Sequence, residues 1–453
     1  MDLKDKACKK YFKIYFLMQD PSIKYILKLS IPIFFANLAI PMVGIIDTAL
    51  MGNLGNLSYL SATSVAANLF SMIFWSFGFL RMGTVGMVSQ ANGKENYEEI
   101  INIVLRNFLF VLIISIILIA VQNYILYLSL QVFDLSETTQ KLYKEYFNIR
   151  IYSAPGELTL YIIAGLFVGL QKTKISSIAI GFFSILNIIL SIILVTKYDL
   201  NIKGVAYGTL FSALITSSIF LIYTFFFLNK LSKISLNFSE ILSVRKLNDI
   251  FNINFNIFIR TVLLTFSFLW FTFLGTKIGE EFVAANTILI NLVFLSAFIL
   301  DAYAFSTEGL VGYSLGKNNL SLFKKILKNS FILSSITGLI ISIFYFLFSN
   351  YAISLMSDIE EVKQLSSKFI IWLIILPFIA SFCYQFDGIF IGASQTKELR
   401  NAMMFSVFCY LIISIVLTKY YLNTGVWISL CIFMILRTLS LFYYLKNILI
   451  RFN

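Results

Sequence analysis

Long apolar runs dominate this sequence and restrict what it can fold into. They are separated by short polar or basic segments and fall at residues 29–52, 60–91, 101–129, 146–170, 175–197, 203–229, 250–275, 282–314, 328–350, 366–394, 401–420 and 424–447. About 20 consecutive apolar residues are the length that an α-helix needs to cross a bilayer. The pattern therefore predicts an all-α polytopic membrane protein with twelve transmembrane helices.

The composition supports this class and excludes others. Hydrophobic residues make up 59% of the chain and charged residues only 13%, whereas soluble domains carry about 25% charged residues. These values exclude a soluble enzyme, a disordered chain and a nucleic-acid-binding domain. The net charge of +12 is explained by loops on the cytoplasmic side, which collect Lys and Arg. Their distribution predicts that both termini are cytoplasmic, with residues 1–28 as a basic cytoplasmic lead-in.

An internal repeat indicates how the helices are arranged. The segment GLFVGLQKTK, which starts at Gly165, matches GIFIGASQTK, which starts at Gly388, and the offset is 223 residues. The same offset relates Gly86 to Gly309 and Gly93 to Gly316. Each copy holds six spans, an even number, so the copies have the same orientation and a pseudo-two-fold axis along the membrane normal. The predicted units are a six-helix bundle at 29–229, a cytoplasmic linker loop at 230–249 and a second bundle at 250–453.

The residue types restrict the chemistry that this chain can perform. It contains no His, and its four Cys show no paired spacing, so neither a metal site nor a disulfide framework is expected. No phosphate-binding loop or catalytic Ser motif is present, so we expect no cofactor and no enzymatic activity. An intramembrane enzyme would need a cluster of acids in one loop, and none is present. Any transport must draw its energy from an ion gradient, and carboxylates must carry any protons.

Five carboxylates fall inside the predicted spans, namely Asp47, Glu157, Asp301, Glu308 and Asp387. Each costs about 2.5–3.5 kcal/mol at the centre of a membrane helix and therefore needs a partner, water or a proton. Asp47 borders a stripe of the first helix that includes Asn37, Pro41 and Thr48 at helical spacing. We interpret this stripe as a cleft or hinge surface and Asp47 as an ion or proton site. The alternative is an acid near the helix end that reaches water.

The remaining acids have basic residues at matching depths. Arg260 is expected at the depth of Asp301, where the two form an ion pair that is either structural or functional. The cytoplasmic third of the helices is expected to hold Arg81, Glu308 and Asp387. These residues form either a cytoplasmic gate network or pairs that neutralise one another where the helices pack. Arg150 and Arg437 are both candidate partners for Glu157.

Four segments together resemble a known family. They are IDTALMGNLG from Ile46, FLRMGTVGMVSQANG from Phe79, ILDAYAFSTEGLVG from Ile299 and FDGIFIGASQTKELRNAM from Phe386. They resemble the DinF-like branch of the multidrug and toxic compound extrusion (MATE) family. The resemblance implies a V-shaped pair of six-helix bundles in a bacterial inner membrane. It also implies export of organic, often cationic or amphipathic, compounds, driven by inward H⁺ or Na⁺.

The resemblance also implies site residues. The family's ion- or proton-responsive Asp falls on Asp47, with the family's Asn on Asn187 and its Thr on Thr209. Many members carry a second Asp where this chain has Ser191. A site with one carboxylate binds a hard cation less well, so H⁺ is favoured over Na⁺.

These observations predict a monomeric antiporter for small organic substrates, with Asp47 as the coupling residue. The alternative is a flippase for a lipid-linked precursor.

Overall fold

The computed structural model describes residues 21–133, 135–232 and 238–452. Within these residues the chain is almost entirely helical and no strand occurs. The helices are α2 (Ile23–Gly52), α3 (Leu57–Ser76), α4 (Phe79–Gly93), α5 (Tyr97–Ala120), α6 (Gln122–Val132), α7 (Glu137–Arg150), α8 (Ala154–Gly169), α9 (Thr173–Thr196), α10 (Asn201–Leu231), α11 (Phe238–Ile241), α12 (Val244–Thr276), α13 (Glu280–Gly316), α14 (Leu320–Met356), α15 (Glu360–Lys368), α16 (Ile370–Gly392) and α17 (Thr396–Leu449).

The predicted membrane-spanning architecture is confirmed. Eleven helical stretches in the described residues are long and apolar enough to cross a bilayer. The last of them, 396–452, is interrupted at Leu422, where the backbone leaves the helical region with φ 48° and ψ −132°. It therefore contains two passes, which gives the twelve expected helices. α3 and α4 together form one pass, and α7 and α8 form another.

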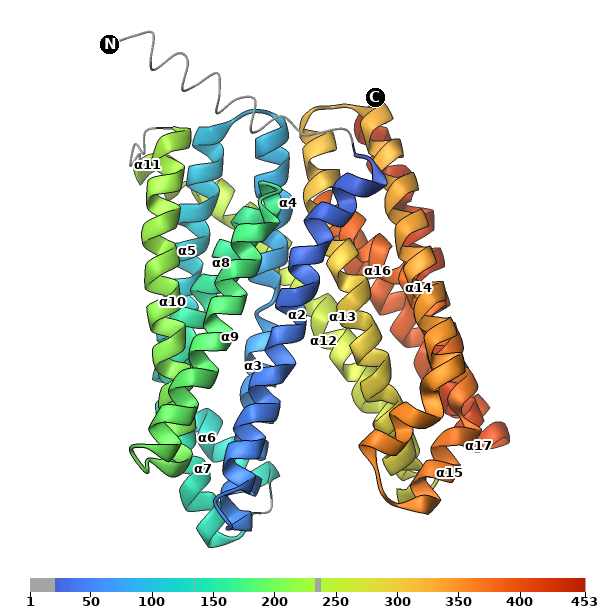
Figure 1. The fold of residues 1–453 in the computed structure, drawn as a ribbon. Helices are drawn as coiled ribbons and strands as arrows, with labels where there is room; N and C mark the ends of the chain where they lie inside the picture. Colours follow the sequence, from blue (N-terminus) through green and yellow to red (C-terminus); the bar gives the residue numbers. More distant parts are fainter. Residues whose placement is uncertain (1–20, 134, 233–237, 453) are drawn as a thin grey trace.

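The helices form two halves. Figure 1 shows α3 to α11 on one side and α13 to α17 on the other, with α2 and α12 running between them. The halves meet at the end of the molecule where α2 begins and the C-terminus lies, which we call the closed end, and they diverge toward the opposite, open end.

Several predicted helix boundaries differ from the structure, and two of them lie at the limits of the predicted units. α2 begins at Ile23 instead of residue 29, because the Ser22 side chain accepts a hydrogen bond from the backbone N–H of Tyr25 and caps the helix. The linker is also shorter than 230–249, since α10 continues to Leu231 and α12 starts at Val244. Residues 1–20 of the predicted lead-in lie outside the described residues.

The repeat extends to backbone conformation. Among the described non-glycine residues with positive φ, three pairs are separated by the repeat offset: Glu95 and Asn318, Gln171 and Ser394, and Asp199 and Leu422. Two helix N-caps repeat in the same way, since Asn96 caps α5 and Asn319 caps α14 through their side-chain oxygens. The two copies therefore share their turns as well as their helices, as expected for halves related by a pseudo-two-fold axis.

This symmetry is most direct where the halves touch at the closed end. A β-carbon at Gly93 would lie 2.2 Å from the carbonyl oxygen of Tyr313, and one at Gly316 would lie 2.1 Å from the carbonyl oxygen of Gln90. Tyr313 is the repeat equivalent of Gln90, so the two contacts are copies of each other. The ends of α4 and α13 approach this closely because both crossing residues lack a side chain.

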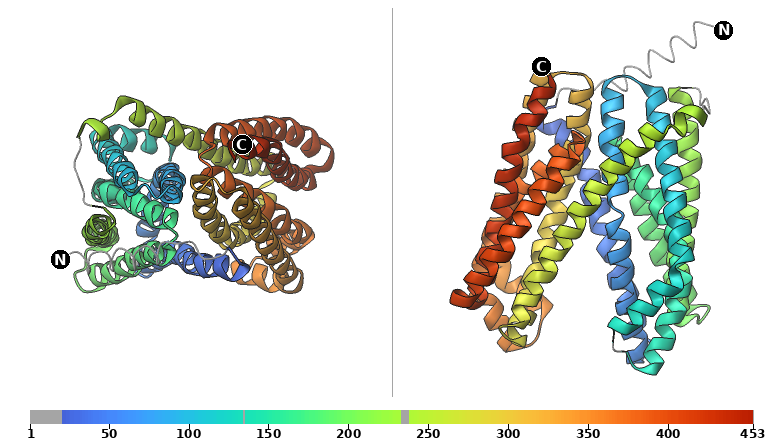
Figure 2. Two further views of the ribbon diagram at one scale, coloured as in Figure 1. Left: turned by 90° about the horizontal axis from the view of Figure 1, so that it is seen from above. Right: turned by 180° about the vertical axis from the view of Figure 1, so that it is seen from behind.

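The first helix of each copy crosses between the halves. At the closed end α2 packs into an apolar cluster of the second half through Ile26 and Leu29, and near the open end Met51 packs into the first half. α12 does the reverse. Its Ile257 belongs to the core of the first half, and its Phe271 packs on Trp427 of the second, with 4.9 Å between ring centroids. Figure 2 shows α12 running diagonally from one half to the other.

Candidate functional site

Asp47 lies on the outer part of α2, in contact with α9. Its side chain is buried, with the residue only 8% exposed, so it does not reach water as an acid at a helix end would. The Ser191 hydroxyl lies beside the carboxyl, and Arg150 is the cation that acts on it. Its Oδ1 atom has no hydrogen-bond partner among the described residues. An unsatisfied carboxylate oxygen in a buried site is an acceptor for a proton or a cation.

The other two predicted coupling residues lie in the same place. Asn187 on α9 donates through Nδ2 to the Thr209 hydroxyl on α10 at 2.9 Å, and its Oδ1 accepts from Ser191 at 3.4 Å. Ser191 therefore links Asp47 to the Asn187–Thr209 pair. α9 and α10 are close enough for this because Gly208 packs directly on Ser191. The structure thus brings Asp47, Asn187 and Thr209 into one polar group within the first half.

A second polar group adjoins this one. Arg150 at the end of α7 forms an ion pair with Glu157 and also donates to the Ser153 hydroxyl. Of the two candidate partners for Glu157, the structure selects Arg150, while Arg437 lies in the other half. Because Glu157 already neutralises Arg150, Asp47 has a cation nearby without a direct ion pair to it.

The three α2 residues that were predicted as a cleft or hinge surface have different surroundings. Asn37 is buried between the halves and donates to the carbonyl oxygen of Phe298 on α13 at 3.3 Å. Pro41 is half-buried within a continuous helix. Thr48 is exposed and donates to the Gly44 carbonyl of its own helix at 2.7 Å. Of these three residues, Asn37 forms a hydrogen bond between the halves.

One buried ion pair connects the halves. Both terminal nitrogens of Arg81 on α4 donate to the two carboxylate oxygens of Glu308 on α13, at 3.0 and 3.2 Å. The guanidinium also lies over the Phe305 ring, 3.7 Å from its centroid. The side chains are 9% and 1% exposed. This two-point geometry is typical of strong Arg–carboxylate pairing.

The third charged group lies within the second half and corrects one expectation. Arg260 pairs with Asp387 on α16 and not with Asp301, and Arg437 pairs with the same Asp387 oxygen at 2.7 Å. Asp301 is half-buried and lies within range of the Arg260 charge, but it forms no ion pair with a described residue. Helix depth predicted the level of Arg260 correctly, but it did not predict which neighbouring helix the side chain faces.

Comparison with known proteins identifies the family. The MatE family model matches residues 32–193 and 257–420, one segment in each copy of the repeat. The chain belongs to the MatE family. It is 30% identical to DNA damage-inducible protein F of Escherichia coli over 416 residues, which are 91% of this chain and 90% of that protein. It is 23% identical to the multidrug export protein MepA of Staphylococcus saprophyticus over 70% of this chain and 69% of that protein.

The fold is also that of solved MatE relatives. One structure, described as the outward-facing conformation of a multidrug resistance MATE family transporter of the MOP superfamily, superposes with a TM-score of 0.87. The match has 18% identity and covers 96% of this chain and 98% of that one. The predicted family, its DinF-like branch and the paired-bundle membrane fold are confirmed.

Sequence reasoning missed one buried cation of this MatE protein. Arg106 on α5 is fully buried; it pairs with Glu99 at 2.9 Å and donates to the carbonyl oxygens of Glu240 and Ile241 in α11. Glu99 lies seven residues earlier on the same helix, and this spacing was the available signal. The carbonyl acceptors belong to the linker between the copies. Because they are backbone atoms, no residue type in the sequence indicates them. No cluster of three or more potential metal ligands occurs in the described residues.

Proposed function

We propose that this protein is a secondary antiporter that exports small organic compounds in exchange for protons, with Asp47 as the coupling carboxylate. The observation that carries the proposal is the buried Asp47 carboxyl with an unpartnered oxygen. It lies within one half, beside polar side chains of α9, on a helix that also contacts the other half. A change in its charge therefore acts on the helix that joins the two halves.

The closed end is proposed to face the cytoplasm of a bacterial inner membrane. Both ends of the described chain lie there, and Lys and Arg accumulate on this side, as in cytoplasmic loops. The structure then corresponds to the state in which substrate leaves on the outer side. The halves exchange this state for an inward-open one by rocking about the contacts between α4 and α13.

Protons are proposed as the coupling ion because the site contains few ligands for a metal cation. Asp47 is the one carboxylate of the group, and the surrounding oxygens belong to Ser191, Asn187 and Thr209. Asn187 is already hydrogen-bonded to both Thr209 and Ser191. Hard cations are bound most tightly by sites with several charged oxygens. A single proton, which moves one charge, gains about 2.3 kcal/mol for each 100 mV of membrane potential.

The test is transport by the purified protein in proteoliposomes. A pH gradient that is acidic outside should drive efflux of a fluorescent organic cation, and Asp47→Asn should abolish this efflux, because the amide cannot exchange a proton. Asp199→Asn, at a turn near the open end, is the matched control and should keep wild-type rates. Efflux by Asp47→Asn at the rate of the control would refute the coupling role.

A second variant tests the choice of ion. Ser191→Asp restores a second carboxylate beside Asp47 and should make efflux respond to a Na⁺ gradient at constant pH. Wild-type efflux driven by Na⁺ alone, with no response to pH, would contradict proton coupling.

A further inference from the structure

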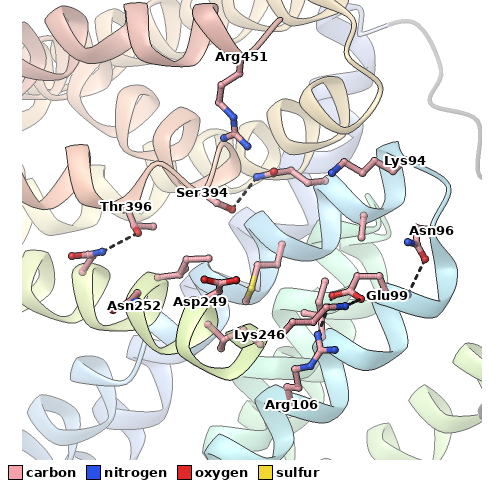
Figure 3. A pocket seen from close by; sticks show the side chains of 17 residues that line it. Lys94, Asn96, Glu99, Arg106, Lys246, Asp249, Asn252, Ser394, Thr396 and Arg451 are labelled. Atoms are coloured by element: carbon pink, nitrogen blue, oxygen red, sulfur yellow. Dashed lines mark hydrogen bonds and ion pairs between the residues drawn. The ribbon is translucent and has the colours of Figure 1, made fainter. Parts of the chain in front are cut away.

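A polar cavity occupies the closed end, apart from the Asp47 site. Its volume is about 710 Å³, and it lies among α4, α5, α12, the turn between α16 and α17, and the C-terminal residues. Figure 3 shows the side chains that line it, and its charged residues are Lys94, Glu99, Arg106, Lys246, Asp249 and Arg451. Both copies of the repeat contribute to the lining.

Positive charge exceeds negative charge in this lining. Arg106 and Lys246 share one acid, Glu99, at 2.9 and 2.7 Å. One Arg451 nitrogen donates to the Ala393 carbonyl at 2.7 Å, and its other N–H groups have no hydrogen-bond partner in the part of the chain that the structure describes. Lys94, at the end of α4, also lines the cavity. Asp249 is the other acid of the lining, so four cations face two carboxylates.

The repeat shows that the fold does not require a polar cavity here. The α12 residues Lys246, Asp249 and Asn252 line it, and their equivalents in the first copy are Ile23, Ile26 and Leu29. Ile26 and Leu29 pack there into an apolar core with Phe323 and Ile326 of α14. The same helix crossing is thus filled by apolar side chains on one side of the pseudo-two-fold axis and is hollow and charged on the other.

We propose that this cavity binds a phosphate group and that the bound group holds the closed end together. Arg and Lys are the side chains that bind phosphate oxygens best, and the Asn252, Ser394 and Thr396 side chains add neutral donors. The volume leaves room for the ester that a phosphate carries. Arg451 and Lys94 belong to different copies, so a ligand between them favours the state in which the halves meet.

Two sources present this chemistry at the proposed cytoplasmic face: the headgroup of an anionic phospholipid and a soluble phosphate compound. The choice between these two sources depends on the proposed orientation of the protein in the membrane. The binding of a phosphate group in the cavity does not. The test below measures binding and closure without transport, so failure of proton coupling would leave its outcome unchanged.

The experiment uses the full chain in nanodiscs and reports thermal unfolding and the distance between the halves. In the first arm phosphatidylcholine discs are titrated with inorganic phosphate against chloride at equal ionic strength. In the second arm phosphatidylglycerol replaces part of the phosphatidylcholine without added phosphate. A rise in the unfolding midpoint and a narrower distance distribution in either arm support the site, and the responding arm identifies the source. No response in both arms overturns the proposal.

Charge variants separate this site from general anion binding. Arg451→Gln and Lys94→Gln should weaken binding about tenfold each, whereas Asp249→Asn should strengthen it by removing a repulsive charge. Lys317→Gln is the matched control, because Lys317 is the repeat equivalent of Lys94 and does not line the cavity. The pair Asp249→Ile with Asn252→Leu copies the first repeat and should abolish binding in a folded protein. Equal loss in the Lys317 control, or weaker binding by Asp249→Asn, would overturn the assignment.

Discussion

The ion pair between Arg81 and Glu308 should control how tightly the closed end is sealed. Replacing Glu308 with Gln removes the carboxylate but keeps the side-chain volume, and the buried Arg81 guanidinium loses its ion-pair partner. When the halves separate at this end, the same guanidinium gains access to water. The substitution therefore penalises the closed arrangement selectively.

The magnitude follows from the geometry. Removing one partner of a buried ion pair costs about 3–5 kcal/mol, whereas removing both is often close to neutral. The Arg81 side chain retains 9% exposure, which places the cost near the lower end, at about 3 kcal/mol. Since about 1.4 kcal/mol changes an equilibrium constant tenfold, Glu308→Gln should shift the closed-to-open ratio by about 100-fold. The double variant with Arg81→Gln should recover most of this shift.

Double electron–electron resonance measures this equilibrium directly. Lys174 and Lys397 are exposed, are equivalent in the repeat, and begin α9 and α17 in different halves. Spin labels on cysteines at these positions, with the native cysteines replaced, should show a longer distance in Glu308→Gln than in the parent. An unchanged distribution in the single variant, or an equal change in the double variant, would refute the reasoning.

Two further substitutions test other parts of the closed end and the repeat. Gly316→Ala places a β-carbon 2.1 Å from the Gln90 carbonyl oxygen. Overpacking of this kind costs about 1–3 kcal/mol, so the spin labels at positions 174 and 397 should again move apart. Gly181→Ala is the control: its β-carbon meets no atom within 4 Å, and the label distance should not change. Leu422→Gly should raise the free energy of unfolding by about 1 kcal/mol, because Leu422 is exposed and has a φ of 48° that disfavours side chains; a lower unfolding midpoint in detergent would contradict this.

The sequence predicted the fold well because both the hydropathy pattern and the internal repeat can be read directly from the order of the residues. Twelve apolar runs define the helices, and the 223-residue offset defines their pairing into two copies. The interruption at Leu422 also falls between two predicted helices. Boundaries at Ile23 and Val244 were missed because the helices continue beyond their apolar parts into polar turns.

The candidate site was less predictable because side-chain direction depends on helix rotation and tilt. Arg260 faces Asp387 instead of Asp301 for this reason. Asp47 was identified because a carboxylate in an apolar span is conspicuous, but its neighbours on α9 and α10 came from family resemblance. The polar cavity could have been suspected, since Asp249 and Asn252 stand where the first copy has Ile26 and Leu29.

The crossing of α2 and α12 has a consequence for any attempt to divide the molecule. Cutting the chain at the linker would not release two self-sufficient six-helix proteins, because each fragment would keep a first helix that packs apolar residues into the core of the other fragment. Co-expressed fragments should therefore purify together. A polypeptide that contained only one copy would have to dimerise in parallel to cover the same surface, and fusion of two such genes would preserve that dimer within a single chain.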